Sequence, residues 1–209
     1  MNLENLPSVV HRKLFKMFDA CDLFFLSITF GNIKETIQKM NLDISDIAMD
    51  MTAKRKLFLL KIQCSSTGRQ YLSFTTKIPN GTKRQKPVYL KIGDLTLKCR
   101  IFFPVQPEDP TVIFLNKKYG PILITSVIPY LCDLFDTQSV TYRLSYKKFK
   151  RFPTITTARG VVLQDKHITY KRVLTLLCRI KVTKFLLLPT LQRRPSVGYS
   201  PFSKCQICT

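Results

Sequence analysis

The sequence is poor in the residues on which most enzyme sites depend. It has two histidines, seven glycines and no tryptophan in 209 residues. After Thr52 there are only six acidic residues, and their spacing does not indicate a catalytic pair. It contains neither a glycine-rich phosphate loop nor a nucleophile elbow. General acid–base chemistry needs positioned histidines or carboxylates, so we expect no catalysis and no cofactor.

Long apolar runs are also lacking. Runs such as residues 57–60, 122–124 and 185–188 have at most four residues, whereas a helix that spans a bilayer needs roughly 20 residues. The first residues do not have the basic and apolar regions of a signal peptide. Seven cysteines, an odd number without framework spacing, are typical of reduced thiols. We therefore expect a cytoplasmic or nuclear protein without a membrane segment.

Two local motifs resemble functional sites but are not interpreted as such. Cys205 and Cys208 have the spacing of two zinc ligands, but a structural zinc site takes four. Neither His11 nor His167 completes such a set, so we expect no metal and a disordered basic tail over residues 191–209. The sequon at Asn80 is interpreted as an Asn-Gly turn.

Charge is distributed unevenly along the chain. Through Thr52 there are five Lys or Arg against seven Asp or Glu, and afterwards 29 against six. The net charge of +21 therefore lies in the downstream part. This change predicts an N-terminal module over residues 1–42, an acidic connector over 43–55 and a second domain over 56–190.

The N-terminal module is expected to be helical. Of its first 40 residues 20 are apolar, and three short helices are indicated by Pro7 in a first turn, by a cap at Asp19 or Asp22, and by a capping-box-like start at Asn32 and Glu35. Helices this short cannot bury all of that surface among themselves. We interpret them as a docking surface, with packing on the rest of the chain as the alternative.

Residues 6–37, LPSVVHRKLFKMFDACDLFFLSITFGNIKETI, resemble the F-box, the adaptor-binding motif of substrate receptors in SCF-type ubiquitin ligases. The family has a Leu-Pro opening, an apolar doublet, a short turn with aspartate and a Leu-x-x-Leu-Ser helix, which correspond here to Leu6-Pro7, Leu14-Phe15, residues 19–22 and Leu23 to Ser27. Ile33, Thr29 and Ala20 stand where the family usually has Trp, Val and Pro.

The resemblance implies a partner and a set of contacts. A Skp-family adaptor, and through it a cullin, is expected to dock on Leu6, Pro7, Val10, Leu14, Phe15, Leu23 and Leu26. The segment GPILITSVIPYLCDLFDTQSVTYRLSY resembles the F-box-associated domain of a large nematode family of F-box proteins. That likeness implies a downstream domain that binds an unknown protein target, with leucine-rich-repeat-like strand and helix units.

From residue 56 the pattern changes to strands. KLFLLKIQC and RQYLSFTTKI, and then VYLKI and LTLKCRIFF joined through Gly93-Asp94, predict two antiparallel hairpins. A helix is expected from residue 121 or 122 to 135, kinked or shortened by Pro129, then the strand VTYRLSY, a helix over 169–179 and the strand VTKFLLLP. The predicted fold class is α+β, with three N-terminal helices followed by β-hairpins and alternating strand and helix units.

The basic charge favours one rival function. A pI near 9.9 and basic clusters at residues 83–86, 147–151 and 193–194 are typical of a nucleic-acid-binding protein. Aromatic residues near the second cluster are candidates for base stacking: Tyr142, Tyr146, Phe149 and Phe152. No recognised nucleic-acid motif is present, and a basic surface equally suits an acidic protein target. Nucleic-acid binding is therefore the alternative function.

Overall fold

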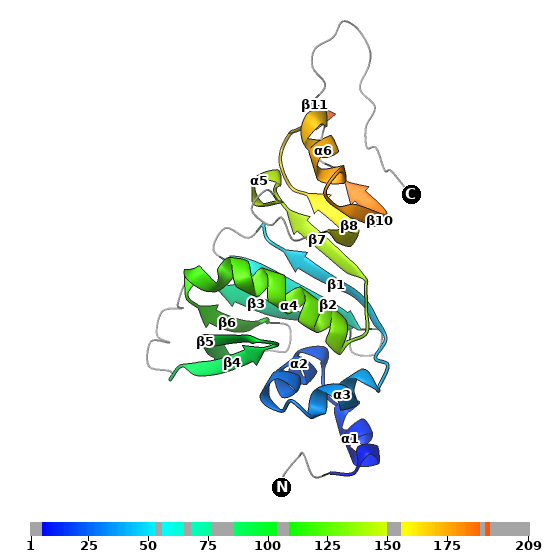
Figure 1. Ribbon diagram of the computed structural model, residues 1–209, viewed down its shortest axis with the longest axis vertical. Helices are drawn as coiled ribbons and strands as arrows, with labels where there is room; N and C mark the ends of the chain where they lie inside the picture. The colour runs from blue at the N-terminus through cyan, green and yellow to red at the C-terminus, as the bar shows by residue number, and fades with distance from the viewer. Residues whose placement is uncertain are drawn as a thin grey trace, which may run out of the picture.

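A computed structural model describes residues 6–52, 56–64, 68–76, 86–103, 109–149, 156–188 and 191–192. Within them the chain forms six α-helices, one short 3-10 helix and 11 strands. Nine strands make one mixed sheet in the order β10-β8-β7-β1-β2-β3-β6-β5-β4, and β11 pairs with β9 (Figure 1). The fold class is therefore mixed α+β.

The helices and strands have the following bounds. The helices are α1 (Ser8–Phe15), α2 (Ala20–Thr29), α3 (Ile33–Gln38), η3 (Lys117–Tyr119), α4 (Gly120–Leu134), α5 (Tyr146–Phe149) and α6 (Tyr170–Leu177). The strands are β1 (Ile44–Asp50), β2 (Lys56–Cys64), β3 (Gly68–Thr75), β4 (Val88–Ile92), β5 (Leu95–Phe102), β6 (Thr111–Leu115), β7 (Val140–Leu144), β8 (Thr157–Leu163), β9 (Ile168–Thr169), β10 (Lys181–Leu187) and β11 (Leu191–Gln192).

Local signals explain where the first three helices begin. Pro7 directly precedes α1, and the side chain of Asp19 accepts a hydrogen bond from the Asp22 backbone N–H at 2.7 Å, which caps α2. The capping box expected at α3 is not formed. Asn32 has φ −71° and ψ −22°, a helical conformation in which its side chain makes no cap hydrogen bond, whereas a capping residue is normally extended.

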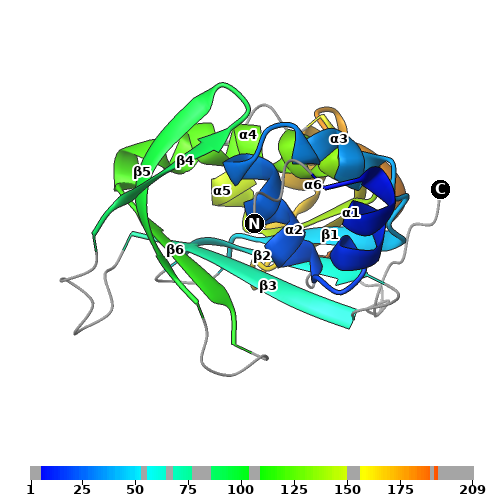
Figure 2. The same cartoon turned by 90° about the horizontal axis from the view of Figure 1, so that it is seen from below.

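The rest of the chain covers α2. Figures 1 and 2 show α1, α2 and α3 on the same face of the sheet as α4, with the β4–β5 hairpin curling towards α2. Helix α2 contacts β2, β3, β4 and α4. Leu23 and Phe24 are fully buried, and the Phe24 ring meets the Tyr130 ring of α4 edge to face at 6.0 Å. Packing on the rest of the chain therefore accounts for this helix.

The segment 43–55, expected as an acidic connector, instead supplies a central strand. β1 pairs antiparallel with β2 and parallel with β7. Ile47 and Met49 are fully buried, while Asp46, Ala48 and Asp50 alternate with them and remain partly exposed. The acidic side chains occupy the outer positions of the strand. Composition alone therefore makes this segment look like a polar connector, although its inner side is apolar.

The two predicted hairpins are confirmed. β2 pairs antiparallel with β3, and β4 pairs antiparallel with β5. In the tight turn between β4 and β5, Gly93 has a positive φ of 58°, a conformation that glycine adopts easily. Strand β6 was not expected from the sequence. It lies between β3, to which it is parallel, and β5, to which it is antiparallel, and so joins the two hairpins into one sheet.

The other half of the sheet is parallel. β1, β7, β8 and β10 are neighbours and run in the same direction. The helices predicted around Pro129 and over 169–179 correspond to α4 and α6, and Pro129 lies inside α4. Strand β8 was not expected. Its Gly160 lies under the Phe185 ring of β10, where an added Cβ would come within 2.2 Å of the ring.

Other sequence-based expectations concern segments outside the described residues. These are the sequon at Asn80, Phe152, the Cys205 and Cys208 pair and the tail from residue 193 onward. Residues 191–192, which begin the expected tail, form β11. Among the described helices there is none with the length and apolar character needed to cross a membrane.

Candidate functional site

The outer side of α1 carries exposed apolar side chains among the exposed basic residues Arg12, Lys13 and Lys16. Val9 is 64% exposed, Val10 43% and, just beyond the helix, Met17 82%, and Pro7 is exposed as well. On the other side His11 and Phe15 are buried, with their rings stacked at 5.3 Å, and α1 packs against α3. We call Pro7, Val9, Val10 and Met17 the outer α1 face.

The seven residues expected to contact an adaptor are divided by the structure into three groups. Pro7 and Val10 are exposed; Leu6, Leu14 and Leu26 are partly buried; Phe15 and Leu23 are buried. A protein partner can reach the first group directly. Phe15 and Leu23 lie in the core of the chain and are not open to a partner. Val9 and Met17 were not singled out from the sequence, although they flank the same motif.

Polar contacts fasten the helical module to α4. Lys34 of α3 forms an ion pair with Asp133, and its ammonium nitrogen lies 4.9 Å from the centre of the Tyr130 ring. The side-chain amide of Gln38 donates to the Asp133 carbonyl at 2.9 Å and to its carboxylate at 3.3 Å. Because these groups come from α3 and α4, they hold these two helices against each other.

A pocket of about 580 Å³ opens beside this junction. It is bounded by α3, by the second half of α4 and by the first residues of β7 and β8, and its polar lining includes Gln38, Asp133, Asp136 and Tyr142. Cys132 also lines it, and burial raises the pKa of this thiol to about 11. Burial likewise raises the pKa of Tyr142. Both groups are therefore neutral at physiological pH.

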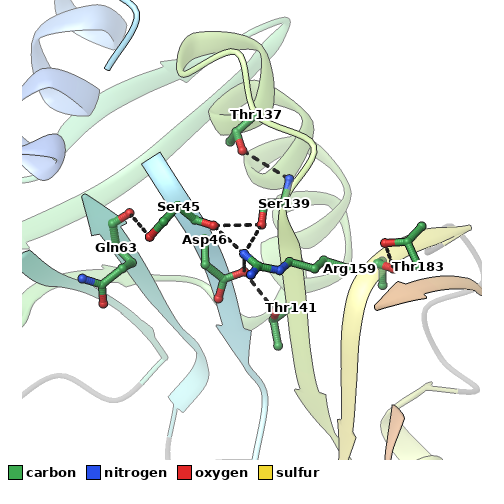
Figure 3. A network of polar contacts seen from close by, with 9 residues as sticks. Ser45, Asp46, Gln63, Thr137, Ser139, Thr141, Arg159 and Thr183 are labelled. Atoms are coloured by element: carbon green, nitrogen blue, oxygen red, sulfur yellow. Dashed lines mark hydrogen bonds and ion pairs between the residues drawn. The ribbon is translucent and has the colours of Figure 1, made fainter. Parts of the chain in front are cut away.

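A second polar network ties together three parallel strands (Figure 3). Arg159 of β8 extends across β7, and its Nη1 donates to the carbonyl oxygen of Ser45 at 2.6 Å and to Ser139 Oγ at 2.7 Å. The same nitrogen lies 3.9 Å from the Asp46 carboxylate, which also accepts a hydrogen bond from Thr141. These partners are internal to the chain, so we assign the network to the fold.

The aromatic residues proposed for base stacking are mostly inaccessible. Tyr142, Tyr146 and Phe149 are buried among neighbouring side chains, whereas a stacking platform must present its ring to solvent. In the basic cluster around them, Lys147 is exposed, but Lys148 donates to the carbonyl oxygen of Met51. Of the cluster at 83–86 only Lys86 is described, and it is exposed. Among these described residues, the nucleic-acid alternative is therefore supported by their basic charge and not by exposed aromatic rings.

Metal-ligating side chains do not gather in the described part of the chain. There, no group of three or more His, Cys, Asp or Glu side chains is placed to hold an ion. The cysteines in that part are free, and burial raises the pKa of Cys99 to about 11. A thiol with so high a pKa is a poor metal ligand and a poor nucleophile at neutral pH.

Comparison with known proteins does not identify a relative. No family model matches the chain, and no curated protein or solved structure shows significant similarity to it. The F-box resemblance of residues 6–37 therefore stays a prediction, which rests on the residue pattern. The outer α1 face and the pocket are two candidate sites among the described residues.

Proposed function

We propose that this protein is the substrate-recognition subunit of an SCF-type ubiquitin ligase. In this proposal a Skp-family adaptor docks on the outer α1 face, and the downstream domain binds a protein target. The observation that carries it is the exposure of Val9, Val10 and Met17 within the segment that resembles an F-box. Exposed apolar side chains grouped on one surface are typical of protein interaction sites.

The energetics of the outer α1 face suit a protein partner. Fully burying a large apolar side chain stabilises a complex by about 1.5–3 kcal/mol. A few such anchors at the centre of an interface can supply most of its affinity. Because α2 is already covered by the sheet and α4, the adaptor would approach α1 rather than insert between the helices and the sheet. Phe15 and Leu23 would then support the interface from below.

The proposal extends to the finer features of the fold. In this proposal the three short N-terminal helices form the F-box, and the parallel strands β7, β8 and β10 with the helices between them form leucine-rich-repeat-like units. The chain would act by binding alone, while the ligase components brought by the adaptor and the cullin transfer ubiquitin.

The test is co-purification with a Skp-family adaptor. Val10→Glu places a charge on the outer α1 face, and Val88→Glu is its matched control because Val88 on β4 is 42% exposed, against 43% for Val10. We expect wild type and Val88→Glu to retain the adaptor and Val10→Glu to lose it. A second variant, Leu6→Ala with Pro7→Ala, tests the opening of the motif without adding charge. Circular dichroism melting of each variant verifies that it is folded.

Failure of the folded wild-type protein to retain any adaptor would overturn the proposal. Equal loss in Val10→Glu and Val88→Glu would also count against it, since binding would then not depend on the outer α1 face. In that case the same preparation should be titrated with DNA and RNA at several salt concentrations. Affinity that falls steeply with salt would favour the nucleic-acid alternative.

A further inference from the structure

The pocket beside the junction of α3 and α4 differs in charge from the rest of the chain. The whole sequence has a net charge of +21, yet the described residues that line this pocket include two aspartates and no lysine or arginine. It also lies at the C-terminal end of α4, where the helix carries partial negative charge. Asp133 is paired with Lys34, so among the described residues Asp136 supplies the unpaired negative charge of this pocket in a basic protein.

Tyr142 is the least accessible polar side chain in the lining. It is only 6% exposed, and its hydroxyl has no hydrogen-bond partner in the described part of the chain. That hydroxyl is also not among the completely enclosed polar atoms without a partner, so it keeps an opening, and the pocket that Tyr142 lines provides it. The hydroxyl is therefore available to a polar ligand group that reaches this depth.

The two aspartates differ in availability. Asp133 is already engaged by Lys34 and Gln38. Asp136 follows the end of α4 with a positive φ of 46°, is exposed, and has no ion pair or hydrogen bond from its carboxylate within the described residues. Since Gln38 uses its amide N–H to hold Asp133, its amide oxygen is left as an acceptor. The groups that remain available thus favour a ligand rich in N–H donors.

The pocket also has an apolar wall. Ile128, Pro129 and Val140 line it beside the polar groups. A ligand that suits both parts carries a cationic donor group on an apolar stem. Arginine has this form: its guanidinium has five N–H donors in a planar fork, and its methylene stem packs on apolar surface. Lysine offers a compact charge with fewer directed donors.

We propose that this pocket binds an arginine side chain of the target protein. This inference rests on the proposed function, because it names the chemical group of the target protein that the downstream domain would recognise. The guanidinium would meet the Asp136 carboxylate and the Tyr142 hydroxyl, and the stem would lie along Ile128 and Val140. At about 580 Å³ the pocket also has room for the peptide backbone next to the arginine.

The experiment is a titration of the isotope-labelled full chain, followed by NMR, with Nα-acetyl-arginine N-methylamide. The citrulline analogue is the matched ligand control, because it has nearly the same shape without the charge. We expect saturable shifts at residues lining the pocket with the arginine probe, and affinity about ten-fold lower for citrulline, as expected for loss of a charged hydrogen bond. The corresponding lysine probe should also bind more weakly.

Two variants connect the binding to named groups. Asp136→Asn keeps a residue that tolerates positive φ and should weaken arginine binding about ten-fold. Tyr142→Phe removes only the hydroxyl and should weaken it several-fold. Asp94→Asn, at an exposed aspartate in the β4–β5 turn, should leave it unchanged. No adaptor is present in the titration, so failure of adaptor docking and failure of arginine binding are observed separately.

Three results would overturn the proposal. They are shifts that do not saturate or that lie outside the pocket, equal affinity for the arginine and citrulline probes, and unchanged affinity in a folded Asp136→Asn protein. The first would mean that the pocket does not bind this ligand, and the second that charge does not matter. The third would show that the guanidinium does not depend on Asp136.

Discussion

The hydroxyl of Tyr130 on α4 donates a hydrogen bond to Ser27 Oγ on α2 at 3.0 Å, across 103 residues of sequence. Ser27 in turn donates to the carbonyl oxygen of Phe24 at 2.7 Å. The tyrosine ring also contacts Phe24 edge to face, at 6.0 Å between centroids. One side chain of α4 therefore provides both a polar and an aromatic contact to α2, and fixes where the helical module sits.

We expect Tyr130→Phe to lower the free energy of unfolding by about 1 kcal/mol, because it removes one hydrogen bond but keeps the ring. Urea denaturation followed by circular dichroism measures the change. Tyr89→Phe is the control, since Tyr89 on β4 is largely exposed and should show almost no effect. Equal stability of Tyr130→Phe and wild type would mean that water replaces the bond without cost.

Two substitutions within the F-box-like segment should differ strongly in their effect on stability. Leu23→Ala deletes a fully buried side chain and should cost about 2–5 kcal/mol. Val10→Ala acts on the outer α1 face and should change the free energy of unfolding by less than about 0.5 kcal/mol. Thermal melting of both variants tests this. A large loss for Val10→Ala would show that the outer α1 face is needed for folding.

The sequence predicts the elements whose signals are local. The helical periodicity around α4 and α6, the cap at Asp19 and the turn at Gly93 each lie within a few residues of the element they define. β1, β6 and β8 were not predicted, unlike the parallel strands β7 and β10, and each of the three pairs with a strand that is not its neighbour along the chain. In β1, the acidic outer positions concealed the alternation of Ile47 and Met49.

The candidate sites were predictable to different extents. The F-box-like pattern led to Pro7 and Val10, which are exposed, but hydrophobicity could not tell these docking candidates from Phe15 and Leu23, which are buried. The pocket could not be predicted, because its walls come from α3, α4, β7 and β8. Tyr142 was expected near a basic surface, yet β7 is covered on both faces and the residue is buried.

Arg159 should contribute to stability mainly through hydrogen bonds. Arg159→Ala removes the donors to Ser45 and Ser139 and should cost about 1–3 kcal/mol. Asp46→Asn should cost less than about 1 kcal/mol, because the separation of 3.9 Å from Arg159 in a partly exposed pair makes the ion pair weak. Chemical denaturation compares the two. A greater loss for Asp46→Asn would show that the charge pair dominates.

Thiol labelling should separate the cysteines of the described residues. Cys178 is exposed, whereas Cys132 is partly buried with its pKa raised to about 11. At about pH 8 only about 0.1% of such a thiol is ionised, so iodoacetamide should modify Cys178 first. Peptide mass spectrometry measures both rates. Raising the pH to about 10 should speed labelling of Cys132 roughly 100-fold if the fold is intact. Rapid modification of Cys132 at the lower pH would contradict this assignment.

β1 and α2 both pack against elements that come much later in the chain, and this has a consequence for how the protein is made. Asp46 on β1 receives a hydrogen bond from Thr141 on β7, 95 residues later in the chain, and α2 is covered by β4 and α4, which also follow it. Since a ribosome releases the N-terminal residues first, the apolar side of α2 stays uncovered until those later elements have been synthesised. Nascent chains that stall before α4 would therefore expose Leu23 and Phe24 and be prone to aggregation.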